Sequence, residues 1–326
     1  MTGATALAGL RPGPWLTFGI RRLARFAVSL WVLVTVAFLM IQLIPGDPVR
    51  AALGLTAPAE LVQAQRAALG LDHPIWQQYL DYLGGLLHGD FGTSMLTGLP
   101  VSDVLGDRLP ATLLLALPAY LVVIAVAIPL GLLFAVLTRG GRRRHTELTF
   151  TSTTILLAAI PEFLVAVALV AFFSVQLGWF PVAGRDGVGS LLLPVAALAL
   201  GPASVLSRIV RVETLSVLGN DFVRTARAKR LPARLVYLRH ALPNALTATL
   251  TLGGLLLSGM LAGTVLVENV FAWPGLGATI ARSILQKDYP MVQGIVLVYG
   301  IGVLLMNLVV DVLLAVLDPR STIRES

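Results

Sequence analysis

The chain has 326 residues, of which 56% are hydrophobic and only 13% are charged, and its mean hydropathy is +0.85. Soluble domains usually carry about 25% charged residues, so this composition excludes an ordinary soluble protein and predicts one that is solvated by lipid. The net charge of +7 does not indicate nucleic-acid binding, because the basic residues fall in short loops between apolar runs, as the orientation rule for membrane proteins predicts.

The first apolar run, residues 26–44, follows several arginines in the amino-terminal segment 1–25 and ends at Pro45-Gly46. Its length is close to the ~20 residues that a helix needs to cross the hydrocarbon core. A cleaved signal peptide is the alternative interpretation. The run is long for a signal core, however, and no Ala-x-Ala site follows it, so we predict a membrane anchor.

The segment 45–111 is too long to be a simple connection to the next apolar run. Between Asp47 and Arg108 it holds seven acidic residues against three arginines. Residues 58–69 and 75–87 have the spacing of two short amphipathic helices, each introduced by a proline. We expect a small extracytoplasmic helical segment that could not fold alone.

Five further apolar runs are long enough to span a bilayer, and all are much longer than the ~10 residues of a barrel strand. They are residues 112–137, 151–177, 191–209, 245–267 and 291–317. The predicted fold is therefore an all-α polytopic membrane protein with six transmembrane helices. Its core would span 112–317, with a large loop at 210–243 and a short tail at 318–326.

The orientation follows from the distribution of lysine and arginine. Of the 24 such residues, 18 lie in the amino terminus, in 138–150, in 208–243 and in the tail. Because positive charge accumulates on the cytoplasmic side, both termini are predicted to be cytoplasmic.

The loop 210–243 is the most basic stretch of the chain. Asn220 or Asp221 can cap a helix, in which Phe222, Val223 and Ala226 would share one face. Such a helix, lying along the membrane surface, could insert into a groove on a soluble partner. The alternative is a positively charged loop that only contacts lipid headgroups.

The spacing in this loop resembles the cytoplasmic "EAA" loop of bacterial ATP-binding-cassette (ABC) importers, which docks on the ATPase subunit. Thr225 and Ala226 hold the small positions, and Leu242-Pro243 follow at the expected interval. The resemblance implies an ATPase-coupling role for Asp221, Phe222, Val223, Arg224, Thr225, Ala226, Arg227, Ala228, Lys229, Arg230, Leu242 and Pro243.

Two positions of this loop depart from the family pattern. Arg224 replaces the usual acidic residue, and Arg230 replaces a glycine that would turn the chain with positive φ. Arginine in that conformation would lose about 1 kcal/mol. Alternatively, Pro232 shapes the turn by holding Leu231 extended.

Other motifs extend the resemblance along most of the chain. They are residues 43–48, 89–94, 108–112, 268–277 and 318–320. Their order and spacing are similar to those of the first permease subunit of dipeptide, oligopeptide and nickel importers, which has the type I (MetI-like) permease fold. The longest motif contains Glu268, Phe271, Trp273, Pro274, Gly275 and Gly277.

The resemblance implies a subunit of the bacterial inner membrane that forms half of a pathway for short peptides or a similar solute. Its expected partners are a homologous second permease, two ATPase subunits or domains, and an extracytoplasmic substrate-binding protein. ATP and Mg²⁺ would bind to the ATPases, since neither lysine of this chain follows a glycine as a phosphate-binding P-loop requires. The absence of cysteine excludes disulfides, thiolate metal sites and cysteine nucleophiles. No cofactor, metal or catalytic residue is expected.

Ionisable and amide side chains inside the predicted spans are candidates for function, because they are costly in lipid. Glu162 follows Pro161 in the third run, and Asn307 and Asp311 lie on one side of the last. They could line the pathway, relay protons, or hold helices together by hydrogen bonds. A proton-coupled secondary transporter that uses Glu162 and Asp311 is therefore the alternative function. A further pair, Gly259 and Gly263, would permit close helix packing.

Overall fold

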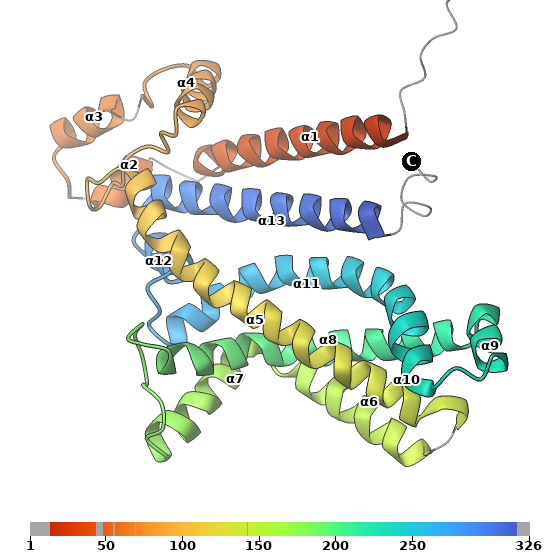
Figure 1. Ribbon diagram of the computed structural model, residues 1–326. Coiled ribbons are helices and arrows are strands. Elements are labelled where there is room, and N and C mark those ends of the chain that lie inside the picture. Colours follow the sequence, from red (N-terminus) through yellow and green to blue (C-terminus); the bar gives the residue numbers. More distant parts are fainter. Residues whose placement is uncertain (1–13, 44–47, 55, 69, 142, 318–326) are drawn as a thin grey trace, which may run out of the picture.

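The computed structural model describes residues 14–43, 48–54, 56–68, 70–141 and 143–317 (Figure 1). In these ranges the chain is helical apart from turns, loops and an antiparallel bridge between Thr93 and Pro100. Residues 1–13, residues 44–47 of the motif at 43–48, and the predicted tail 318–326 with its motif at 318–320 lie outside the described residues.

Among the described residues, five long helices are apolar enough to cross a membrane, or six if the broken helix described below counts as one span. The five are α1 (Pro14–Gln42), α5 (Val101–Leu137), α8 (Gly189–Leu218), α11 (Leu242–Val270) and α13 (Tyr289–Leu317). Each begins before the apolar run predicted from the sequence, and α8 also continues well past residue 209. The difference arises because hydropathy marks only the part of a helix that suits lipid, whereas backbone hydrogen bonding continues into polar flanks.

The third apolar run forms a broken helix. Helix α6 (Arg144–Ala159) is followed by α7 (Glu162–Leu169), and the two are bent by 91°. Pro161 explains the break: a residue before proline is pushed out of the helical region, and Ile160 is extended at φ −75° and ψ 121°. A short π-helix, η2 (Val170–Gln176), continues α7 and completes the second half of the broken helix.

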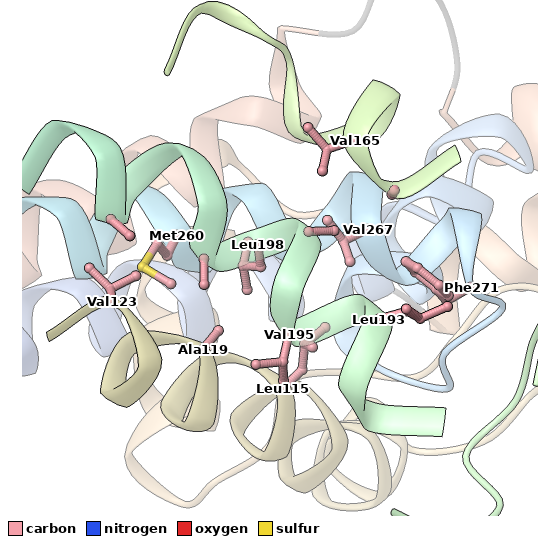
Figure 2. Close-up of a cluster of buried hydrophobic side chains, with 14 of the residues drawn as sticks. Leu115, Ala119, Val123, Val165, Leu193, Val195, Leu198, Met260, Val267 and Phe271 are labelled. Atoms are coloured by element: carbon pink, nitrogen blue, oxygen red, sulfur yellow. The ribbon is translucent and has the colours of Figure 1, made fainter. Parts of the chain in front are cut away.

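Helix α8 lies at the centre of the hydrophobic core, between α5, α7 and α11 (Figure 2). The residues that meet there include Leu115, Ala119 and Val123 of α5, Leu193, Val195 and Leu198 of α8, Met260 and Val267 of α11, and Val165 of α7. Gly131 of α5 allows a close approach, because a Cβ there would lie 2.5 Å from Cβ of Val210.

The segment before α5 forms a cap of α2 (Pro48–Leu53), α3 (Ala59–Ala68) and α4 (Ile75–Leu87). The cap is fixed to α1 by hydrogen bonds between Thr35 Oγ1 and the Tyr79 hydroxyl, 2.8 Å, and from Gln42 Nε2 to Gln78 Oε1, 2.8 Å. It lies at one end of the long helices, and the basic loop lies at the other (Figure 1).

Candidate functional site: the basic hairpin and the signature loop

The basic loop folds as a hairpin that connects α8 to α11. It contains α9 (Asp221–Ala228), the single turn α10 (Ala233–Leu235) and the short π-helix η3 (Val236–Ala241). Asn220 is the N-cap residue in an extended conformation, but its side chain makes no capping hydrogen bond. The backbone N–H groups of Val223 and Arg224 instead donate to its carbonyl oxygen.

The apolar side of α9 packs within the subunit. Val223 is 0% and Ala226 6% exposed. They form a small cluster with Val217 and Leu218 at the end of α8, Val236 and Ala241 of η3, and Ala245 of α11. The single face predicted for Phe222, Val223 and Ala226 is therefore divided, because the hairpin itself buries the last two.

The remaining surface of the hairpin is open. Phe222 is 42% exposed. The residues Asp221, Arg224, Thr225, Ala228, Lys229 and Arg230 are also exposed, and Arg227 is partly buried. Helix α9 thus presents one aromatic side chain among basic residues on its outward surface, and Leu238 of η3 is also exposed, at 45%. Leu242, partly buried, and Pro243, exposed, begin α11.

The turn after α9 has the geometry for which a glycine was expected. Arg230 has φ 55°, and its N–H donates to the carbonyl of Arg227 at 2.8 Å, while Leu231 N–H donates to Ala226 at 3.3 Å. These bonds close the C-terminus of the helix. The sequence left two possibilities for this turn, and the structure shows the first: Arg230 itself adopts the positive φ. Pro232 then precedes α10 as its N-cap residue.

The signature loop 268–277 is organised around a buried carboxylate. Glu268 is 0% exposed. Its Oε1 accepts a hydrogen bond from Thr112 Oγ1 at 2.7 Å, and its Oε2 accepts one from Ala278 N–H at 3.0 Å. Thr112 Oγ1 also accepts the N–H of Leu276 at 2.8 Å. Two side chains therefore satisfy N–H groups at the start of α12 (Leu276–Leu285), which have no partner within that helix.

The glycines of this loop make room for that carboxylate. A Cβ at Gly275 would lie 2.4 Å from the Glu268 carboxyl group, and one at Gly277 would lie 2.5 Å from the backbone of Val265. Real Cβ atoms essentially never make contacts this short. A side chain at position 277 would displace the backbone of α11, and one at position 275 would displace the buried Glu268 carboxylate.

The rest of the loop joins α11 to α5. Trp273 is 1% exposed and its Nε1 donates to the carbonyl of Ala111 at 2.9 Å, and Phe271 is 2% exposed. Arg108 donates to the carbonyl of Pro274 at 3.4 Å. These contacts join α11 to α5 through the loop.

The three polar residues of the spans have separate surroundings. Glu162 lies against Gly263, where a Cβ would be 2.5 Å from Glu162 Oε1, and it has no hydrogen-bond partner among the residues that the structure describes. Asp311 pairs with Arg22 of α1 at 2.5 Å. Asn307 is exposed and accepts a hydrogen bond from Ser258 at 3.5 Å. Asp311 therefore joins two helices, and within the described part of the chain no contact connects it to Glu162 for a proton relay.

The predicted glycine seam also differs from its expected form. Gly259 has no atom within 4 Å of its Cβ position, so within this subunit only Gly263 of the pair lies close to another helix. Gly263 accommodates the Glu162 carboxylate.

Two buried polar clusters were not recognised from the sequence. Arg211 of α8, 8% exposed, donates to Thr138 Oγ1 at 2.9 Å and to Glu147 Oε1 at 2.7 Å, so it joins α8 to the α5–α6 turn. Asp288, 2% exposed, accepts a hydrogen bond of 2.5 Å from Ser94 Oγ. From the sequence alone, Arg211 was only one of the basic residues assigned to the segment 208–243. Its spacing of four residues beyond Ser207, which is also buried, was the available signal.

Comparison with known protein families and sequences finds matches to membrane components of transport systems. Residues 127–323 match the family model described as "Binding-protein-dependent transport system inner membrane component", and residues 15–116 match the N-terminal model of the same transport systems. The chain is similar to the glutathione transport system permease protein GsiC of Escherichia coli K12, with 34% identity over 93% of this chain and 98% of that protein. The GsiC protein of Salmonella choleraesuis is 36% identical over the same shares.

A solved structure shows the same fold. A chain of the MetNI methionine ABC transporter, in an inward-facing conformation, superposes with a TM-score of 0.53 and 19% identity, over 66% of this chain and 96% of that one.

Proposed function

The chain belongs to the family of binding-protein-dependent transport-system inner-membrane components, and from that premise we propose how this ABC importer permease works. It forms half of a transmembrane pathway, and a homologous second permease completes it. Two ATPase subunits or domains bind at the hairpin end, and a binding protein delivers the solute at the cap end.

The proposed solute is a short peptide, including glutathione-like tripeptides. The support is the similarity to glutathione permeases, which extends over almost the full length of both chains. A relation of this extent makes a solute of the same chemical class the simplest proposal.

The observation that carries the ATPase contact is the outward surface of the hairpin, where exposed Phe222 stands among basic residues. The buried side of α9 then has a mechanical role. Because Val223 and Ala226 pack on α8 and α11, a displacement of α9 by the ATPase is passed to two helices of the core. Close packing transmits such a shift, because packed interiors are not easily compressed.

We propose that both termini and the hairpin are cytoplasmic, and that the cap is outside. The support is the concentration of lysine and arginine on the hairpin side and of acidic residues in the cap. The cap would contact the binding protein or cover the entrance to the pathway.

A topology experiment tests this orientation. A reporter enzyme that is active only outside the cytoplasm should be active when fused near residue 80 or 185, and inactive when fused near 143 or 230. Fusions with a cytoplasmic reporter at the same four positions should give the opposite pattern. An active outside reporter at 230 would contradict the orientation and the ATPase contact together.

The test of the function uses the complete importer in proteoliposomes, with the binding protein outside and ATP inside. We expect uptake of radiolabelled glutathione or a dipeptide to stop when internal ATP is withheld, and to continue when an ionophore collapses the proton gradient. Uptake that needs the gradient and not ATP would instead support the secondary transporter that uses Glu162 and Asp311.

A further inference from the structure

A cavity of about 410 Å³ lies between α6, α8 and α11 and has both apolar and charged walls. Val205 and Ile209 of α8 and Leu252 of α11 form its apolar part, and Arg208 and Glu213 of α8 contribute opposite charges. The cavity belongs neither to the hairpin nor to the signature loop.

Most of the lining of the cavity lies on the side of α8 away from α5, although Ile209 also packs against the core cluster. The main stripe of the lining consists of Val205, Arg208, Ile209 and Val212, which recur at the i, i+3, i+4 and i+7 positions of one helix face. Ser207 and Val210, which contact Gly131 of α5, lie roughly on the opposite face at about 100° per residue. Val212 of this stripe is 57% exposed, so part of the stripe is open to the outside of the subunit.

Two of the three charges at the cavity are unpaired among the residues that the structure describes. Arg211 is occupied by Glu147 and Thr138. Arg208 forms no ion pair, and its Nε is buried without a hydrogen-bond partner. Glu213 has no ion pair either. The two lie five positions apart on α8, about 7.5 Å along the axis and about 140° around it, so they do not neutralise each other.

Both charges lie at the end of α8 that the distribution of lysine and arginine assigns to the cytoplasmic side, and a buried N–H of a guanidinium group without an acceptor is costly. A cation and an anion held apart beside apolar walls match a solute that carries both charges and a small apolar body. A guanidinium can bind a carboxylate through two parallel hydrogen bonds, and a carboxylate can accept hydrogen bonds from an ammonium group.

We propose that this cavity is a subsite for a zwitterionic solute, whose carboxylate binds Arg208 and whose ammonium group binds Glu213. The inference rests on the proposed function, in which this cytoplasmic end of α8 would border the exit of the pathway. It adds a site in the permease itself that recognises the charged groups of a peptide.

The first test measures dialanine uptake by the reconstituted importer with saturating loaded binding protein. Arg208→Gln and Glu213→Gln should each lower the uptake rate roughly tenfold or more, the effect of losing one hydrogen bond to a charged group. ATP hydrolysis stimulated by the binding protein should persist. The matched control is Arg144→Gln, which removes an exposed arginine at the start of α6 and should transport normally.

The outcomes separate the possible partners of these charges. Equal loss in Arg144→Gln and Arg208→Gln, dependent on the anionic lipid content of the vesicles, would assign Arg208 to lipid headgroups. Loss of co-purification of the other subunits in Arg208→Gln would assign it to a subunit contact. Either result, or normal uptake by both variants, would overturn the subsite. Absence of uptake by the unmodified importer would instead contradict the proposed function.

A second measurement does not depend on transport. Because the chain has no cysteine, Ile209→Cys places one thiol in the cavity wall for labelling by a water-soluble maleimide. Dialanine should slow the labelling of this subunit, and N-acetyl-dialanine amide, which carries neither charge, should not. Adding Arg208→Gln should remove the protection. Equal labelling with and without dialanine would contradict the proposal.

Discussion

Replacing Glu268 with alanine is expected to destabilise the subunit by about 3 to 5 kcal/mol. The carboxylate accepts hydrogen bonds from Thr112 and Ala278, and each hydrogen bond to a charged group contributes roughly 1.5–3 kcal/mol. Its removal also leaves an N–H group at the start of α12 buried without an acceptor. Thermal unfolding of the detergent-solubilised complex should therefore begin at a clearly lower temperature, and less subunit should accumulate in the membrane.

Two variants make this prediction specific. Glu268→Gln keeps the shape and one carbonyl acceptor, so its loss should be smaller. Asn269→Ala changes the neighbouring exposed residue, whose amide donates to Val265 in its own helix at 2.7 Å and only at 3.5 Å to Gly277 of α12, and should cost about 1 kcal/mol or less. If Glu268→Ala unfolds at the same temperature as Asn269→Ala, the carboxylate does not hold α12 in place.

The sequence predicts the membrane helices well because each is a long apolar run, and composition alone limits such runs to helices in lipid. It predicts less about their shape. Pro161 signals a disturbance, but the 91° bend between α6 and α7 depends on how α7 packs on α8, which no local pattern contains.

The hairpin illustrates a second limit. Its position follows from spacing, but an apolar stripe does not indicate whether it contacts the same subunit or a partner. Val223 and Ala226 are buried because Val217 and Ala245 come from the two helices that the hairpin connects, and these contacts exist only in the folded chain.

The motif of the signature loop can be recognised in the sequence, but the sequence gives no physical reason for its residues. Glu268 and Thr112 are far apart in the sequence, and their hydrogen bond explains why Gly275 and Gly277 accompany the carboxylate. Arg211 was missed for the same reason, since Glu147 and Thr138 precede it by a whole broken helix.

Replacing Phe222 with serine is expected to weaken the association with the ATPase subunits roughly 3- to 10-fold, with little loss of thermal stability of the permease. Phe222 is the large apolar side chain that α9 leaves exposed, at 42%, and docking can bury only this exposed part, which contributes roughly 0.6–1.3 kcal/mol of the ~1.5–3 kcal/mol for full burial. The measurement is the binding of purified ATPase subunits to the permease in nanodiscs, together with ATP hydrolysis stimulated by the loaded binding protein.

Ala226→Asp and Arg234→Ala distinguish docking from folding and from charge. Because Ala226 is buried inside the hairpin, an aspartate there should lower both thermal stability and ATPase binding, through an unpaired charge in a packed cluster. Arg234 is exposed on α10, and its removal should weaken binding only a few-fold, since exposed ion pairs contribute about 0–1 kcal/mol. Normal binding by Phe222→Ser combined with strong loss in Arg234→Ala would mean that the hairpin acts through its charge. The aromatic contact would then have no part in coupling.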